Sequence, residues 1–535
     1  MAWPSSSADA ADADAGSWNA VDSLLTVLLA ASSAGVSLAS ILRRPDLWLS
    51  ARDFLFHDAG HNLFVAGVLL AGQRLYADVI YQYGPIPAYA YALAARLFGN
   101  TPAVYDALLA SISAVNMAIA YSLLRASARR SVAVLVAVAL LALLPIPGAI
   151  AGGYLSSPYI VLERAALMLF ALAWCNPRER SLSRSVVLGL CLGFWQALRV
   201  GPAVFAGVAL VILDATWLAA TRADRAEWLH AMRSVLTICA SALVVEAALC
   251  VYAFATLPRP VAVDVVWPSY MLTAYRVVDP GERWPVWAGW RWFVGQTLLP
   301  LAMAALGAIG MIQWVRSLTR RSAIRFRAGV FIPLLFYALA CLGLFHHVWH
   351  FYQFLWALVP GAVWMLERRA MARAVAVVVI APALGLVLHN ALVLRTPEPL
   401  VPLPSGGTVA ADASTVESIA TLDDAVATVV RDHESMLYVP AGSGWMHAFR
   451  VPAVSRDVWF FAPEAVRPYD RLAFLASLDR TAAVASCDEI RGGLDTIFPM
   501  DPAIASEVYS RLVFWKAKGA CRFWRVEPRA SPSAR

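Results

Sequence analysis

Residues 56–61, FHDAGH, bring two imidazoles and one carboxylate together in an otherwise apolar part of the chain. If this segment is helical, His57 and His61 lie on one face with Asp58 beside them, because residues three and four apart are neighbours on a helix. Imidazole and carboxylate groups bind divalent metal ions, so a metal held by His57 and His61 is one interpretation. A hydrated cluster at a membrane surface is the alternative, since these ligands are too few to indicate a particular metal.

Asp58 could also do chemistry without a metal. It lies just beyond the first long apolar run, at the start of a segment that would rest on the membrane. A carboxylate at that depth is partly removed from water, which makes it a better base. A hydrated aspartate without a chemical role is the other interpretation.

Two further places combine polar groups with apolar runs. Arg199 is the single basic residue between two of these runs, where a guanidinium needs an anion such as a lipid phosphate. Otherwise its side chain extends to the headgroups, as long basic side chains do. The turn at 345–353, FHHVWHFYQ, contains His350 and Tyr352, which either anchor the chain at the interface or flank a phosphate or a sugar.

The composition is that of a membrane protein. Of the 535 residues, 60% are hydrophobic and 15% are charged, whereas soluble domains are nearer half apolar and a quarter charged. The net charge of +7 comes mostly from arginine, and in a membrane protein it reports topology and lipid contact rather than nucleic-acid binding. The cysteines form no CxxC pair, so no zinc site is indicated, but Cys487 and Cys521 could form a disulfide if the tail is extracytoplasmic.

Apolar stretches predict a multi-pass α-helical membrane protein with about 11 transmembrane helices, because a span needs roughly 20 apolar residues. The stretches lie at about 21–42, 103–124, 131–147, 158–175, 185–198, 202–219, 233–256, 293–315, 328–345, 351–366 and 373–394.

Short basic loops alternate along the chain and predict its orientation, since positive loops stay in the cytoplasm. These loops are 125–130, 177–184, 221–233, 316–327 and 367–373. The N-terminus is therefore predicted to be cytoplasmic and the tail extracytoplasmic. Residues 85–98 are apolar but too short to span, and predict a helix that lies on the membrane surface.

The tail has the patterns of a small α/β domain, with a polar helical segment followed by short candidate strands. The predicted organisation begins with a disordered cytoplasmic segment (1–20) and a transmembrane domain (21–394) that includes a long external loop (43–102). A linker (395–410), the small extracytoplasmic α/β domain (411–527) and a disordered end (528–535) follow.

The first external loop resembles that of the GT-C glycosyltransferases, in particular the RgtA/B/C/D-like bacterial proteins, which are related to protein O-mannosyltransferases and lipid A aminoarabinose transferases. The resemblance is carried by Asp58, Leu69-Leu70-Ala71-Gly72, Tyr83-Gly84-Pro85-Ile86-Pro87 and Phe98-Gly99. The family usually has Asp-Glu at the first of these positions, where this chain has Asp58-Ala59. A role for a second adjacent acid is therefore not expected here.

The resemblance implies that Asp58 is the catalytic base. It also implies a second acidic residue at Glu163, for which a salt bridge with a neighbouring arginine is the alternative. The residues expected to bind substrate are Tyr83, Glu163, Arg199, His350 and Tyr352.

The implied function is a membrane glycosyltransferase that moves a sugar from a polyprenyl-phosphate-linked donor to a glycan, lipid or protein acceptor, with inversion, on the outer face of the cytoplasmic (inner) membrane. No cofactor is required, although a divalent metal would be compatible with His57 and His61. Membrane lipids are expected partners and nucleic acid is not. A membrane transporter or a non-catalytic envelope scaffold is the alternative.

Overall fold

The computed structural model describes residues 18–43, 45–56, 58–81, 83–127, 130–143, 158–174, 180–198, 202–267, 398–430, 434–438, 442–452, 470–487, 502–519 and 521–528. The spans expected at 293–315, 328–345, 351–366 and 373–394 lie outside these residues. The chain forms two compact units. The first is made of residues 1–40, 109–249 and 279–394, and the second of residues 41–108, 250–278 and 395–535.

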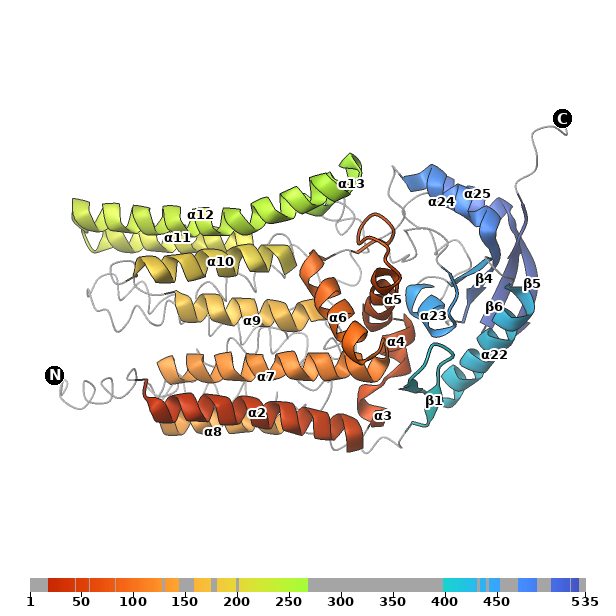
Figure 1. Cartoon of the computed structure of the whole chain (residues 1–535), viewed down its shortest axis with the longest axis horizontal. Coiled ribbons are helices and arrows are strands. Elements are labelled where there is room, and N and C mark those ends of the chain that lie inside the picture. Colours follow the sequence, from red (N-terminus) through yellow and green to blue (C-terminus); the bar gives the residue numbers. More distant parts are fainter. Residues whose placement is uncertain are drawn as a thin grey trace, which may run out of the picture. The chain divides into compact units, whose positions relative to one another are not determined.

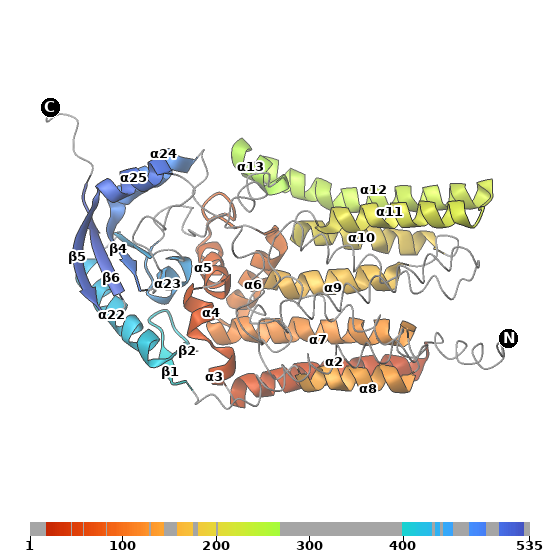
Figure 2. The ribbon, with the colours of Figure 1, turned by 180° about the vertical axis from the view of Figure 1, so that it is seen from behind.

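The described part of the first unit is helical. Its helices, of which the first, second and last extend beyond the unit, are α2 (Ala20–Arg43), α7 (Pro102–Ser127), α8 (Arg130–Leu143), α9 (Pro158–Ala173), α10 (Leu182–Leu198), α11 (Pro202–Ala220) and α12 (Arg225–Thr256). Several begin with proline, which suits the first helical position because its missing N–H has no partner there. In Figures 1 and 2, α9, α10 and α11 run along one another.

Every apolar run that was expected within the described residues is a helix. Three of these helices are long and apolar enough to cross a membrane, namely 20–43, 102–125 and 225–256. Shorter apolar helices cover 182–198 and 206–220. The total of about 11 spans stays a prediction.

Glycines let α10 and α12 approach closely. A Cβ atom added at Gly193 would lie 2.8 Å from the carbonyl oxygen of Ala242 and 2.8 Å from the Cβ atom of Val245. One turn earlier, a Cβ atom at Gly189 would lie 2.6 Å from the Cβ atom of Ser241. Small residues at such contacts are typical of helices that pack in membranes.

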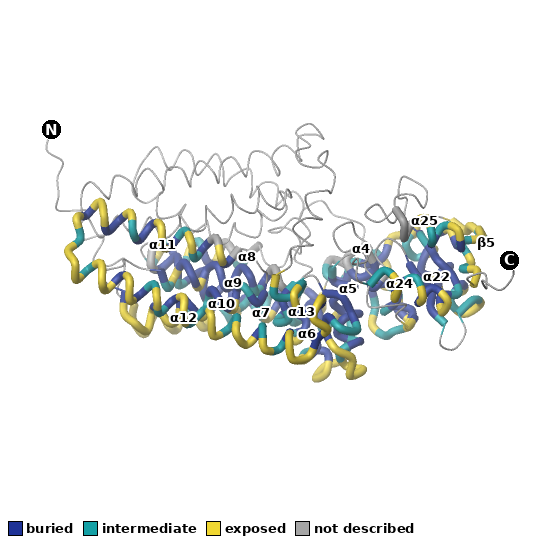
Figure 3. The backbone as a smooth tube through the Cα atoms, turned by 90° about the horizontal axis from the view of Figure 1, so that it is seen from above, coloured by how far each residue is buried: buried dark blue, intermediate teal, exposed yellow. Residues whose placement is uncertain are grey.

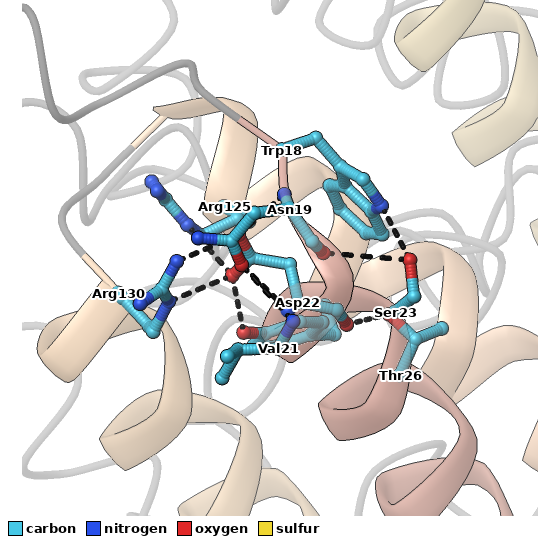
Figure 4. Close-up of polar contacts among 9 residues, drawn as sticks. Trp18, Asn19, Val21, Asp22, Ser23, Thr26, Arg125 and Arg130 are labelled. Carbon is cyan, nitrogen blue, oxygen red and sulfur yellow. Dashed lines mark hydrogen bonds and ion pairs between the residues drawn. The ribbon is translucent and has the colours of Figure 1, made fainter.

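Buried ion pairs join the helices of this unit at their ends. Asp22, in the first turn of α2, is fully buried and receives hydrogen bonds from Arg125 and Arg130, each with a nitrogen–oxygen distance of 3.0 Å (Figure 4). The guanidinium of Arg180 likewise binds Asp214 on α11 at 2.6 Å. The basic loops that predict orientation therefore also supply the counter-ions of buried carboxylates.

The second unit contains the segment 43–102, which was predicted to be the first external loop. Its helices before the tail are α3 (Pro45–Trp48), α4 (Ala51–Phe56), α5 (Asp58–Leu70), α6 (Pro85–Phe98) and α13 (Arg259–Val266). The helix expected at 85–98 is thus α6. After α6, the side chain of Asn100 donates to the carbonyl oxygen of Leu63 on α5 at 2.9 Å and accepts from the hydroxyl of Tyr91 at 2.9 Å. These bonds fix α6 against α5.

The tail supplies an α/β structure to the same unit. Its elements are β1 (Leu400–Pro402), β2 (Thr408–Ala410), α22 (Ala413–Val429), β3 (Ser435–Tyr438), α23 (Gly442–Ala448), α24 (Arg471–Ser477), η6 (Leu478–Arg480), β4 (Thr481–Ser486), α25 (Pro502–Ser510), β5 (Leu512–Lys518) and β6 (Cys521–Val526). Four strands form a sheet in the order β3-β4-β6-β5, in which β3 and β4 are parallel and the other pairs are antiparallel. The predicted polar helix and three predicted strands are confirmed as α22, β3, β4 and β6.

A disulfide links two neighbouring strands of this sheet. Cys487, directly after β4, is bonded to Cys521, the first residue of β6. The two strands are neighbours, with Ser486 opposite Arg522. The structure therefore contains the disulfide that the sequence predicted only for an extracytoplasmic tail.

The tail packs on α4 and α5 inside the second unit. Helix α23 contacts α4 and α5, and the backbone N–H of Ala410 in β2 donates to the carbonyl oxygen of Leu49. Figure 3 shows that α5 is buried along much of its length, whereas α12 has many exposed residues. Because α5 begins at Asp58, the tail lies against the helix that carries the predicted base.

Candidate active site

Asp58 is the first residue of α5 and is half-buried. Its carboxylate oxygen Oδ2 accepts a hydrogen bond from the hydroxyl of Tyr83 at 3.1 Å. Its backbone carbonyl accepts from the side-chain amide of Asn62, one turn later, at 2.7 Å. The N-terminal turn of a helix favours a negative charge, because the unpaired backbone N–H groups point toward it. The structure thus joins two of the predicted site residues, Asp58 and Tyr83.

The position of Tyr83 depends on Tyr76. The hydroxyl of Tyr76 donates to the backbone carbonyl of Tyr83 at 2.7 Å. Burial raises the pKa of Tyr76 well above its usual value, so this hydroxyl stays protonated. Tyr76 itself has a φ of 68°, in the left-handed region that few residues other than glycine adopt. Its N–H donates to the carbonyl of Val79 at 2.9 Å, which helps to hold this conformation.

Asn62 connects α5 to two more tyrosines. Its amide oxygen accepts from the hydroxyl of Tyr81 at 2.9 Å, and its amide nitrogen donates to the hydroxyl of Tyr105 at 3.3 Å. Asn62 is buried, and a buried amide side chain is stable there only when its polar atoms are hydrogen-bonded. These bonds fix the first turns of α5, and therefore the direction in which Asp58 projects.

His61 is buried beneath this network. Its Nδ1 lies 3.0 Å from the hydroxyl oxygen of Ser443 on α23, and its ring stacks on Tyr81 with a centroid distance of 6.0 Å. Burial lowers the pKa of His61 from 6.5 to about 3, so the ring is neutral at neutral pH. Within the part of the chain that the structure describes, no group of three or more histidine, cysteine or acidic side chains could hold a metal ion. His57 lies outside those residues, and a metal at His57 and His61 stays a prediction.

Glu163 lies in the first unit, on α9. It is fully buried, and its Oε1 accepts a hydrogen bond from the indole N–H of Trp195 on α10 at 3.1 Å. This contact was not expected from the sequence. The role of Glu163 in substrate binding stays a prediction.

Several predicted site residues fall outside the described part of the chain. They are His57, Arg199, His350 and Tyr352. Other contributors to the site were not predicted, among them Tyr76, Asn62 and Ser443, besides Tyr81 and Tyr105. Tyr76 lies within the family-like loop but nothing singled it out, Asn62 lies one turn after Asp58 on the helix, and Ser443 is far away in the sequence without any recognisable motif.

Two hydrogen bonds orient Asp58, one to its carboxylate and one to its backbone carbonyl. Tyr83 holds one carboxylate oxygen from the loop, and Asn62 holds the backbone of the same residue from the helix. A carboxylate has about four lone-pair positions on its two oxygens, and the Tyr83 hydroxyl uses one of them. This arrangement suits a general base, which must be positioned before the proton that it removes arrives.

No protein-family model matches the sequence, and no curated protein matches it. Among solved structures, the chain is similar to archaeal oligosaccharyltransferase AglB from Archaeoglobus fulgidus in complex with an inhibitory peptide and a dolichol-phosphate. The identity is 14%, the TM-score is 0.48, and the match covers 94% of this chain and 74% of the other.

The chain is also similar to ArnT from Cupriavidus metallidurans bound to undecaprenyl phosphate, with 12% identity, a TM-score of 0.42, and coverage of 93% of this chain and 97% of the other.

Proposed function

We propose that this chain is a membrane glycosyltransferase that transfers a sugar from a polyprenyl-phosphate-linked donor to a hydroxyl acceptor, with Asp58 as the general base. The acceptor is a glycan, a lipid or a protein. The observation that carries the proposal is the Asp58–Tyr83 hydrogen bond, which orients a carboxylate at the start of α5 within the GT-C-like loop.

In the proposed reaction, Asp58 takes the proton of the acceptor hydroxyl as the hydroxyl oxygen attacks the anomeric carbon. The new carbon–oxygen bond forms while the bond from the anomeric carbon to the phosphate oxygen breaks. The electron pair of that bond leaves with the polyprenyl phosphate. A single displacement inverts the anomeric centre and needs no nucleophile from the protein.

The leaving phosphate gains negative charge in the transition state, and a guanidinium that contacts it would lower the barrier. Arg199 is proposed for this role on the grounds of its type and its place in the sequence. Glu163, Tyr83, His350 and Tyr352 are proposed as substrate contacts. A catalytic metal is not needed for this scheme.

The proposed location is the outer face of the cytoplasmic membrane, with the N-terminus inside. Two features support it. The short arginine-rich loops 125–130, 177–184 and 221–233 favour the cytoplasmic side. The disulfide between Cys487 and Cys521 favours an oxidising compartment for the tail, because disulfides persist outside the cytoplasm.

The test is turnover by the purified full-length protein in lipid nanodiscs. The probes are synthetic undecaprenyl-phosphate hexoses and pentoses, and the release of undecaprenyl phosphate is measured for each. Envelope glycans from cells with and without the protein, compared by mass spectrometry, would identify the acceptor. We expect Asp58→Asn to remove turnover and the glycan difference while leaving the protein folded.

Asp224→Asn is the matched control, because it makes the same chemical change at an exposed position. Asp224 caps α12 by accepting from the N–H of Glu227 at 2.8 Å, and asparagine caps helices equally well. Turnover by Asp58→Asn at the rate of the wild type would reject Asp58 as the base. No turnover of any donor, with no difference in the glycans, would favour a transporter or a scaffold. Activity that survives exhaustive EDTA would exclude a catalytic metal at His57 and His61.

A further inference from the structure

Helix α23 of the tail meets α5 at a crossing between two glycines. A Cβ atom added at Gly60 would lie 2.7 Å from the Cα atom of Gly444, and would also collide with the backbone of Phe54. A Cβ atom at Gly444 would lie 2.7 Å from the carbonyl oxygen of Phe54 and 2.8 Å from that of Leu55. A side chain at Gly60 would force α5 away from both α23 and the end of α4, and one at Gly444 would force α23 away from the end of α4, since real Cβ atoms do not approach other atoms so closely.

A buried polar contact lies beside this crossing. Ser443 and His61 are almost fully buried, and the hydroxyl oxygen of Ser443 lies 3.0 Å from Nδ1 of His61. Burial keeps His61 neutral, so this is a hydrogen bond between two uncharged groups. Buried polar groups require such partners, and losing one partner costs more than the bond itself contributes. The contact therefore fixes the rotation of α5 against α23, one turn from Asp58.

The sheet of the tail holds α23 in place. The ring of Tyr438, at the end of β3, lies 4.7 Å from the ring of Trp445 on α23. Trp445 also stacks on Phe449 at 5.6 Å. The hydroxyl of Tyr438 accepts a hydrogen bond from the backbone N–H of Cys487, which belongs to the disulfide. A continuous set of contacts thus runs from the sheet through α23 to α5.

We propose that α23 positions the proposed base, and that Ser443 is a positioning residue that acts on Asp58 through His61 and the first turns of α5. This inference rests on the proposed function, and it adds residues of the tail to those that act on Asp58. The tail would then be part of the catalytic unit and not a separate module that recruits partners. Its contribution is to orientation, so it should affect turnover more than donor binding.

The experiment compares five forms of the full-length protein: wild type, Ser443→Ala, Ser443→Thr, Gly60→Ala and Gly67→Ala. Ser443→Thr retains the hydroxyl and is the conservative rescue. Gly67→Ala is the matched control for Gly60→Ala, because it lies on the same helix and its nearest neighbour to an added Cβ is Asn100 Nδ2 at 3.4 Å. We measure kcat and KM for the active undecaprenyl-phosphate sugar, normalised to folded protein by size-exclusion chromatography.

Ser443→Ala is expected to lower kcat by about 5- to 50-fold, which corresponds to losing one buried hydrogen bond. Gly60→Ala is expected to lower it by about 100-fold, since a shift of about 1 Å at the reacting group has that effect. In both variants KM for the donor should stay unchanged. Ser443→Thr and Gly67→Ala should turn over like the wild type. A role in folding alone would instead reduce the folded fraction and leave its kcat unchanged, which would overturn the proposal.

Hydrogen–deuterium exchange of the peptide 58–70 provides a readout that does not require activity. We expect faster exchange at the start of α5 in Ser443→Ala and in Gly60→Ala than in the wild type. If the wild type transfers no sugar, the proposed function fails, yet this exchange still tests the contact. Unchanged exchange in both variants, or wild-type kcat in both, would overturn the role of α23.

Discussion

The hydroxyl of Tyr83 donates a hydrogen bond to Oδ2 of Asp58 at 3.1 Å, although 25 residues separate the two in the chain. The Tyr-Gly-Pro turn therefore does more than start α6. It places the hydroxyl of Tyr83 next to Asp58, the first residue of α5. The hydroxyl of Tyr76 in turn donates a hydrogen bond to the backbone carbonyl of Tyr83. These two hydrogen bonds connect the loop between α5 and α6 to the carboxylate of Asp58.

Tyr83→Phe should lower kcat by about 10- to 100-fold, because a hydrogen bond to a charged group contributes about 1.5–3 kcal/mol. The folded fraction should change little, since Tyr83 is only half-buried. Tyr89→Phe is the matched control: its exposed hydroxyl pairs with that of Tyr252 and touches no predicted site residue that the structure describes. Turnover with an undecaprenyl-phosphate sugar is the measurement, and equal rates for the two variants would show that the Asp58–Tyr83 bond has no catalytic role.

Asp22→Ala should destabilise the protein by about 3–5 kcal/mol, because it leaves the buried guanidinium of Arg125 without its carboxylate. Arg130→Ala should cost much less, since the side chain of Arg130 is 33% exposed and water screens its charge. Thermal unfolding in detergent compares the two variants with the wild type. A larger loss for Arg130→Ala than for Asp22→Ala would contradict this ranking.

Gly193→Ala should destabilise the protein by about 1–3 kcal/mol, because the new methyl group must push α10 away from α12. Gly35→Ala in α2 makes the same change where no atom lies within 4 Å of the added Cβ. There alanine should stabilise by about 0.5–1 kcal/mol through its better helix propensity. Melting temperatures that move in the same direction for both variants would show that the α10–α12 contact is not as close as described.

The stability of the protein should fall as the pH is lowered from neutral, in part because of His61. Burial lowers its pKa from 6.5 to about 3, so the unfolded chain binds a proton between these values that the folded chain does not. The free energy of unfolding therefore falls as the pH drops below 6.5, by about 2 kcal/mol at pH 5 relative to pH 7.5. His61→Asn should flatten this dependence in thermal unfolding at the two pH values. An equally steep dependence in the variant would show that His61 is not buried as a neutral group.

The helices of the first unit could be predicted from the sequence because an apolar run of this length is stable in a bilayer only as a helix. Asp58 and Tyr83 could also be predicted, since both belong to one continuous loop with a recognisable pattern. The arginines were predicted only in part. Arg125 and Arg180 carry the charge that indicates orientation, but their pairing with Asp22 and Asp214 is a contact across helices.

Ser443 could not have been predicted, because its contact with His61 joins residues 382 positions apart. Neither residue type nor spacing indicates which helix of the tail meets which helix of the loop. The close approach of Gly60 and Gly444 could not have been predicted either, because the sequence does not indicate that the two glycines are neighbours. The positive φ of Tyr76 could not have been predicted either, because tyrosine rarely adopts this conformation.

The separation between His61 and Ser443 has a consequence for biosynthesis. A ribosome makes α5 hundreds of residues before it makes α23, so Gly60 lacks its contact with Gly444 during most of translation. The contact of α23 with α5 can form only after the tail has been synthesised as far as α23. A nascent chain that ends before α23 therefore has α5 without the hydrogen bond between Ser443 and His61, so this part of the second unit is completed only late in synthesis.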